Sequence, residues 1–296
     1  MPLESIANLI NGCREGGYAV GYFESWNLES LQGVLDAAEQ TRSPIIIGFN
    51  GEFLSHDGRL VAERLTLYGA LGVAAAQSAR VPCGLIFNEC PNDQWIRRAA
   101  ACGFNLVMPA DPLALHESYT SRVRQLVAHC HALGVAVEAE IGELPCGASG
   151  RVEGASRLTD PEVAARFADQ TGVDLLAVSA GNIHIHMSGE QDLDLDHLAL
   201  LRRRVSVPLV LHGGTGISAT SLQEAIRLGV TKVNYGTYLK QDYLRAVRRA
   251  LSREVVNPHE VLGMGGSDDV MVAGREAVRD AVLERIELLG CCGKAR

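Results

Sequence analysis

Eight short apolar runs recur along the chain, and longer segments of mixed polarity separate them. The runs lie at 19–23, 44–49, 82–87, 106–108, 135–139, 175–179, 207–211 and 232–235. Continuous apolar runs of this length are typical of strands buried on both faces, and therefore of a parallel sheet. The segments between them carry apolar residues every three or four positions, which predicts helices. The clearest of these helical segments are 28–41, 58–78, 95–102 and 117–133.

Capping residues mark several helix ends. Asp160 followed by Pro161 predicts a helix start, since proline is favoured in the first turn. Ser221 and Glu224 fit a capping box that would begin a helix near Ala225. Two further helices, at 238–253 and 275–289, follow the eighth run.

Eight strand–helix units in this order predict an α/β protein, a single (β/α)8 barrel over residues 1–296 with extra C-terminal helices. A doubly wound open sheet is the alternative. The absence of a GxGxxG pattern after the first strand disfavours it. The glycine-rich segment 142–157 follows the fifth strand and is either an active-site loop or an ordinary surface loop.

Composition narrows the class of partner. The formal net charge of -8 argues against a nucleic-acid partner. No apolar run approaches the roughly 20 residues of a membrane span, and no signal peptide is visible at the start. The eight cysteines are scattered, which is typical of reduced thiols. We therefore expect a cytoplasmic protein with a small-molecule substrate.

Polar or titratable residues follow each predicted strand, at the rim where (β/α)8 barrels place their active sites. In strand order they are Glu24, Asn50, Asn88 with Glu89, Asp111, Glu140, His184, His212 and Asn234. His184 and His212, at neighbouring strand ends, predict a divalent metal site. Glu89 and Glu140 are the candidate carboxylate ligands. His186 is a further metal ligand, a residue that contacts one of the ligands, or part of a loop.

A glycine-rich turn follows the seventh strand and precedes a helix beginning near Ser218. Backbone N–H groups at such a turn can hold a phosphate, and barrels often build this site from strands seven and eight. The candidate phosphate-binding residues are Gly213, Gly214, Thr215, Asn234, Tyr235, Gly236 and Thr237.

Schiff-base chemistry is not expected. The chain has three lysines, Lys232, Lys240 and Lys294. Lys232 opens the eighth strand at the end of the barrel opposite the site, and the other two lie beyond that strand. A carbonyl substrate would then be activated by a metal ion.

Several stretches resemble the class II (metal-dependent) ketose-bisphosphate aldolases, the family of fructose- and tagatose-bisphosphate aldolases. They include GYAVGYF at 17–23, VEAEIG at 137–142, PLVLHG at 208–213 and GVTKVN at 229–234, and the similarity covers nearly the whole chain. The resemblance implies that His184 and His212 bind Zn²⁺ and that Glu140 contacts the metal in an alternative position. It also implies that 213–215 and 234–237 hold the phosphate of dihydroxyacetone phosphate, and that the chain forms homodimers or homotetramers.

The third strand departs from the family pattern Asp-His-Gly, in which aspartate is the acid/base and histidine the third zinc ligand. Here the residues are Asn88-Glu89-Cys90. Asn88 has no titratable proton, so it argues against ordinary cleavage of fructose 1,6-bisphosphate. Glu89 would complete a set of two histidines and one carboxylate, which could hold Zn²⁺, Mn²⁺, Co²⁺ or Fe²⁺. Glu24, Glu89 or Glu140 would act as base. Glu24 and Asn50 stand at the positions of two polar substrate contacts of the family.

Two classes of function follow from these departures. The first is a metal-dependent lyase that stabilises an enediolate of a sugar-phosphate or related keto substrate, or an epimerase or isomerase on the same scaffold. The second is a catalytically silent relative that binds a sugar phosphate. Retention of His184, His212 and Glu140 favours the enzyme.

Overall fold

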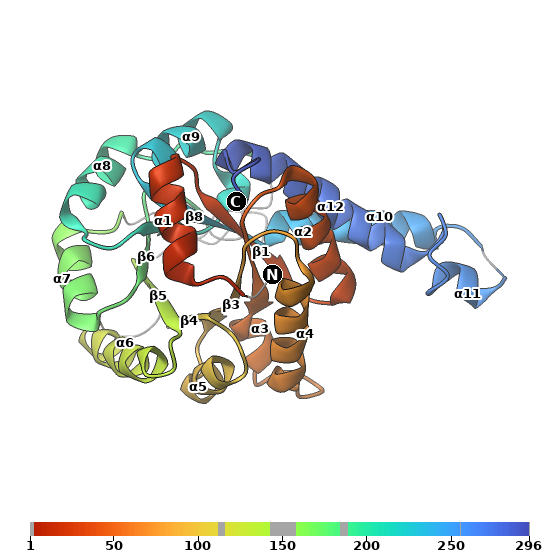
Figure 1. The fold of residues 1–296 in the computed structure, drawn as a ribbon, viewed down its shortest axis with the longest axis horizontal. Helices are drawn as coiled ribbons and strands as arrows, with labels where there is room; N and C mark the ends of the chain where they lie inside the picture. Colours follow the sequence, from red (N-terminus) through yellow and green to blue (C-terminus); the bar gives the residue numbers. More distant parts are fainter. Residues whose placement is uncertain (1–2, 112–115, 143–157, 184–188, 255, 296) are drawn as a thin grey trace.

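The computed structural model describes residues 3–111, 116–142, 158–183, 189–254 and 256–295. Eight parallel strands close into a barrel in sequence order, which confirms the predicted fold (Figure 1). The strands are β1 (Val20–Ser25), β2 (Ile45–Asn50), β3 (Cys83–Cys90), β4 (Leu106–Pro109), β5 (Ala136–Ile141), β6 (Leu175–Val178), β7 (Leu209–Leu211) and β8 (Val230–Tyr235). β1 pairs with both β2 and β8, so the barrel has no open edge.

Helices surround the barrel and return the chain to the start of each strand (Figure 1). They are α1 (Ile6–Gly16), α2 (Leu28–Thr41), α3 (Gly51–Ser55), α4 (Leu65–Ser78), α5 (Asp93–Ala101), α6 (His116–His131), α7 (Pro161–Thr171), α8 (Leu195–Arg204), α9 (Ala219–Arg227), α10 (Thr237–Leu251), α11 (Pro258–Val261) and α12 (Val270–Leu289). The extra C-terminal helices are confirmed. In Figure 1, α10 and α11 reach away from the barrel, whereas α12 returns to pack beside α2.

Three predicted helix boundaries were wrong. The segment 58–78 is not one helix, since α4 begins only at Leu65, and Arg64 before it makes no side-chain capping bond. Capping side chains set the other two boundaries. The capping box at Ser221 does not form. Ser218 caps α9 instead, and the Ser221 hydroxyl accepts a hydrogen bond from the backbone of Leu193. Asp269 caps α12, which therefore begins before the predicted Arg275.

The sixth strand, predicted at 175–179, ends one residue earlier, at Val178. A turn follows in which the Asn182 side chain accepts a hydrogen bond from the backbone of Ala180. The apolar and small residues of this turn resemble a strand in sequence. His184 and His186 lie outside the described residues, so the structure places neither of them.

The close packing of α2 against α12 fixes the C-terminal helices to the barrel wall. Gly33 of α2 faces the backbone of α12, where an added Cβ would lie 2.5 Å from the carbonyl oxygen of Arg275. The Arg275 guanidinium also holds Asp36 through two bonds of 2.6 and 2.7 Å. Among the described residues, no helix combines the length and apolar character needed to cross a membrane.

Candidate active site

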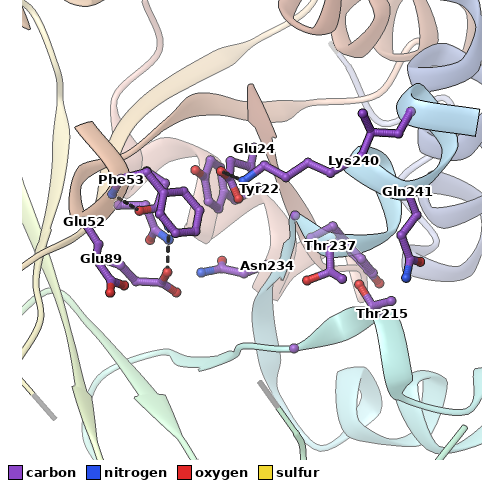
Figure 2. Close-up of a pocket in the computed structure, with 16 residues that line it drawn as sticks. Tyr22, Glu24, Glu52, Phe53, Glu89, Thr215, Asn234, Thr237, Lys240 and Gln241 are labelled. Atoms are coloured by element: carbon purple, nitrogen blue, oxygen red, sulfur yellow. Dashed lines mark hydrogen bonds and ion pairs between the residues drawn. The ribbon is translucent and has the colours of Figure 1, made fainter. Parts of the chain in front are cut away.

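A cavity of about 280 Å³ lies at the C-terminal ends of the strands, between the ends of β1, β2, β3 and β8 and the first turns of α10. Most of the predicted site residues line it. They are Glu24, Asn50, Asn88, Glu89, Gly213, Thr215, Asn234, Tyr235, Gly236 and Thr237. Figure 2 shows that Glu89 and Asn234 face each other across this cavity, while Thr215 and Thr237 lie on the side next to α10. A cavity of this size suits a small ligand.

His212 follows β7 directly and is almost fully buried. Its Nε2 lies 2.9 Å from Glu138 Oε1. On the other side of the ring, Nδ1 makes no hydrogen bond and lies 3.4 Å from Glu89 Oε1 and 3.5 Å from Glu140 Oε1. Burial opposes the charged imidazolium, but the three carboxylates outweigh it and raise the pKa of His212.

The two distances from His212 Nδ1 match the spacing of two donor atoms bound to one divalent metal ion. Metal–ligand bonds of about 2.1 Å in a tetrahedral zinc site place neighbouring donor atoms about 3.4 Å apart. The separations from Nδ1 to the two carboxylates match that spacing, and Nδ1 is otherwise an unsatisfied buried atom. Within the described part of the chain, no group of three or more His, Cys, Asp or Glu side chains is placed so that it could hold a metal ion.

Glu89 reaches this position through an unusual backbone conformation. Its φ is 52°, in the left-handed region, and the pairing of β3 with β4 shifts between Phe87 and Cys90. The side chain is fixed by Asn50, whose Nδ2 donates to Glu89 Oε2 at 2.9 Å. The preceding residue, Asn88, is buried, and its Oδ1 makes no hydrogen bond.

Glu138 and Lys232 lie beneath His212 inside the barrel, and both side chains are fully buried. Lys232 Nζ is 2.8 Å from Glu138 Oε2 and also donates to Asn234 Oδ1. Burial alone would raise the pKa of Glu138, but Lys232 and His212 outweigh it and lower that pKa. The prediction that placed Lys232 at the opposite end of the barrel was therefore wrong. It lies within β8, and its side chain extends toward Asn234.

Lys240 and Glu24 form an ion pair across the mouth of the cavity (Figure 2). The ammonium also lies 4.3 Å from the centre of the Phe53 ring. The Glu24 carboxylate occupies the space beside Gly236, where an added Cβ would lie 2.4 Å from Glu24 Oε2. A side chain at this position would therefore displace the Glu24 carboxylate.

The glycine-rich turn lies against β8, as a phosphate-binding loop requires. Gly213 has a φ of 67°, and an added Cβ on Gly214 would meet the side chains of Val233 and Tyr235 at less than 3.0 Å. The N-cap residue of α10 is Gly236, which has no side chain to cap the helix. The start of a helix can bind an anion through its backbone N–H groups.

Sequence reasoning missed the roles of Lys240, Glu138, Lys232 and Asn182. Asn182 donates to the carbonyl oxygen of His212 at 3.0 Å and so fixes the backbone of that residue. The signal for Glu138 and Lys232 was present, because a charge of each sign interrupts an otherwise apolar strand. Glu138 is also two residues from Glu140, so both project to the same face of β5.

Comparisons with known proteins find relatives over nearly the whole length of the chain. The family described as fructose-bisphosphate aldolase class-II matches residues 4–294. The fructose-bisphosphate aldolase of Geobacillus stearothermophilus is 32% identical over 100% of this chain and 99% of its own length. The uncharacterized protein YdjI of Escherichia coli K12 is 34% identical over 94% of each chain. The crystal structure of YdjI aldolase superposes with a TM-score of 0.82, at 32% identity and over 99% of this chain and 100% of that one. The chain belongs to the class II fructose-bisphosphate aldolase family.

Proposed function

We propose that the protein is a metal-dependent lyase that reversibly cleaves a carbon–carbon bond of a ketose phosphate or related keto substrate. The observation that carries this proposal is the unsatisfied Nδ1 of His212, which faces Glu89 and Glu140 at the distances that a shared metal ion would set. Family membership supports the same class of reaction.

In this proposal His212, Glu89 and Glu140 hold the metal ion, with His184 as a further ligand outside the described residues. When bound, Zn²⁺, Mn²⁺, Co²⁺ or Fe²⁺ polarises the substrate ketone and stabilises the negative charge that bond cleavage leaves on it. Asn50 holds the second carboxylate oxygen of Glu89, so that Oε1 stays directed at His212.

The phosphate group would bind between the turn 213–215 and the start of α10. Thr215, Gly236 and Thr237 line that side of the cavity. The positive end of the α10 dipole and the ammonium of Lys240, which is paired with Glu24, would supply favourable electrostatics for an anion there. This placement leaves the ketone end of the substrate near Glu89 and Asn88.

Glu24 is the carboxylate that we assign to proton transfer. Glu89 and Glu140 face His212, whereas Glu24 lines the cavity beside the proposed phosphate site. Glu24 would accept the proton of the hydroxyl whose carbon becomes the aldehyde. The electrons of the broken carbon–carbon bond would stay on the fragment that carries the ketone. Glu24 would then return the proton to the carbon of that fragment from which the aldehyde was cleaved. Asn88 cannot take this part, because an amide does not titrate near neutral pH.

A metal-content measurement tests the site. The purified protein should hold about one divalent ion per chain. His212→Ala and Glu89→Ala should lose it, whereas Glu15→Gln, a change on the exposed surface of α1, should not. Equal metal content in all four proteins would refute the proposed ligands.

A cleavage screen tests the reaction. Ketose phosphates and unphosphorylated keto acids are offered with Zn²⁺, Mn²⁺ or Co²⁺, to the wild type, to Glu24→Gln and to Asn88→Asp. We expect turnover by the wild type, and a loss of about 10²-fold or more in Glu24→Gln without loss of metal. Gain of fructose 1,6-bisphosphate cleavage by Asn88→Asp would show that the missing acid/base alone prevents that reaction in the wild type.

The second candidate function is binding of a sugar phosphate without catalysis. The amide of Asn88 at the family's acid/base position favours it. Binding of dihydroxyacetone phosphate together with no turnover of any substrate in the screen would establish this function in place of the lyase.

A further inference from the structure

The barrel interior holds a pair of charged side chains that neither metal binding nor proton transfer uses. Glu138 and Lys232 are both fully buried among apolar residues of the strands. The interiors of such barrels are normally filled by branched apolar side chains. Burying an ion pair costs more desolvation than it returns in attraction in many proteins, so stability alone does not account for the pair.

The pair connects two walls of the active site. On one side, Glu138 Oε1 contacts His212 Nε2 at 2.9 Å. On the other, Lys232 Nζ binds Glu138 Oε2 and donates to Asn234 Oδ1. His212 is the central residue of the proposed metal site, and Asn234 lines the substrate cavity.

We propose that Glu138 and Lys232 are positioning residues that fix which atoms His212 and Asn234 present to metal and substrate. This inference rests on the proposed metal site at His212. It assigns no step of the reaction to either residue.

The first consequence concerns the histidine ring. A carboxylate accepts hydrogen bonds and cannot donate them, so Glu138 requires the hydrogen to lie on Nε2 of His212. The lone pair of a neutral ring is then on Nδ1, which is the atom that faces Glu89 and Glu140. Carboxylates that orient metal-binding histidines in this way raise metal affinity in other proteins.

The second consequence concerns the amide of Asn234. An ammonium group only donates, so Lys232 holds the Oδ1 oxygen and turns the Nδ2 amino group away from itself. Nδ2 is buried and has no hydrogen-bond partner. Figure 2 shows that this nitrogen points across the cavity toward Glu89. It is therefore placed to donate to an oxygen atom of a bound substrate.

The decisive variant is Glu138→Gln, which keeps the size of the side chain. In this variant the Lys232 ammonium should hydrogen-bond to the oxygen of the new amide, because a charged donor makes the stronger hydrogen bond. The amide NH2 then faces His212 Nε2 and favours the wrong tautomer. We expect Co²⁺ affinity, measured by chelator competition and by the visible spectrum of the bound ion, to fall roughly 10- to 100-fold.

The double variant Glu138→Gln with Lys232→Met distinguishes a loss of histidine positioning from a non-specific disturbance of the barrel interior. Without the ammonium, the glutamine can rotate and offer its oxygen to His212. Co²⁺ affinity should then recover to within about threefold of the wild type. This variant also leaves no uncompensated buried charge, so it should fold even if the single variant does not.

Lys232→Met alone tests the amide of Asn234. Once the ammonium is gone, Nδ2 is no longer directed into the cavity, and dihydroxyacetone phosphate should bind roughly three- to tenfold more weakly to the Zn²⁺-loaded protein. Thr231→Val is the matched control. It lies next to Lys232 on β8, is buried, and bonds only the backbone of Leu209, so neither affinity should change.

The outcomes distinguish this inference from the proposed function. If the wild type binds Co²⁺ no better than His212→Ala does, the metal site itself is refuted, and the positioning roles with it. If the wild type binds Co²⁺ but Glu138→Gln binds it equally well, only the positioning roles are refuted. The same holds if the double variant binds no better than a folded Glu138→Gln.

Discussion

Substitution of Gly33 by alanine tests how closely α2 and α12 are packed. Two effects of opposite sign compete at this position. Alanine stabilises a helix interior by about 1 kcal/mol relative to glycine. The new Cβ, however, would lie 2.5 Å from the Arg275 carbonyl oxygen and 3.1 Å from the Arg279 backbone nitrogen. Backbone atoms of a long helix cannot move aside singly, so α12 must shift as a whole.

At Gly33 the cost of overpacking should exceed the gain in helix propensity. Overpacking of this kind costs about 1–3 kcal/mol, and displacement of α12 also weakens the partly exposed Asp36–Arg275 pair, which is worth at most about 1 kcal/mol. The net effect is a loss of about 1–2 kcal/mol. For a chain of 296 residues the unfolding entropy is about 0.6 kcal/mol per kelvin, so the melting temperature should fall by about 2–3 °C.

Gly12→Ala is the matched control, since Gly12 also lies inside a helix. Its added Cβ would meet only the hydroxyl of Tyr18, at 2.9 Å, and the end of that side chain can move. The helix propensity should therefore dominate, and the melting temperature should stay level or rise. Urea titration of both variants measures the same difference at equilibrium. Stabilisation by Gly33→Ala equal to that by Gly12→Ala would refute the close contact between the helices.

Three further predictions concern a helix cap, a glycine beside the cavity, and the cysteines. Asp269→Asn should destabilise the protein by about 1 kcal/mol at pH 7, because the amide nitrogen cannot accept the two bonds that Oδ2 accepts from the backbone of Gly263 and Gly265. Those bonds lower the pKa of Asp269 from its ordinary value of 3.8, so the stability that the carboxylate contributes is full above that pH and is lost as the pH falls through the lowered pKa. The stabilities of wild type and variant, measured by urea titration, should therefore converge at acid pH, and a constant difference would contradict this. Gly236→Ala should displace Glu24 and weaken binding of dihydroxyacetone phosphate on the order of tenfold, at unchanged Co²⁺ affinity, as calorimetry would show. Alkylation at pH 8 followed by mass spectrometry should label the exposed Cys292 much faster than the buried Cys13 and Cys83, whose pKa values burial raises to about 12.

The sequence was sufficient to predict the barrel because its strands are buried on both faces and therefore appear as continuous apolar runs. It was less informative about boundaries. A single side-chain oxygen at Ser218 or Asp269 decides where a helix begins, and several residues nearby could have capped equally well. The turn after β6 contains small and apolar residues, so it was indistinguishable from more strand.

Strand ends also predicted which residues meet in the cavity, since parallel strands of a closed barrel all end at one rim. Contacts made by long side chains were not predictable in the same way. Lys240 reaches Glu24 from a helix, and Lys232 reaches Asn234 from within its own strand. Both contacts depend on the conformation of a long side chain, which the order of residues along the chain does not give.

The left-handed backbone at Glu89 limits how this site can evolve. Histidine, asparagine, aspartate and glycine accept that conformation more readily than most residues, whereas β-branched residues are strongly disfavoured there. The histidine that the family pattern has at this position is among the tolerated residues. Exchange between imidazole and carboxylate is thus accessible without rebuilding the loop, but exchange for valine, isoleucine or threonine is not. If Glu89 binds the metal ion as proposed, lineages that descend from this fold can change the preference for that ion at one position, over a small set of permitted side chains, while the rest of the barrel stays intact.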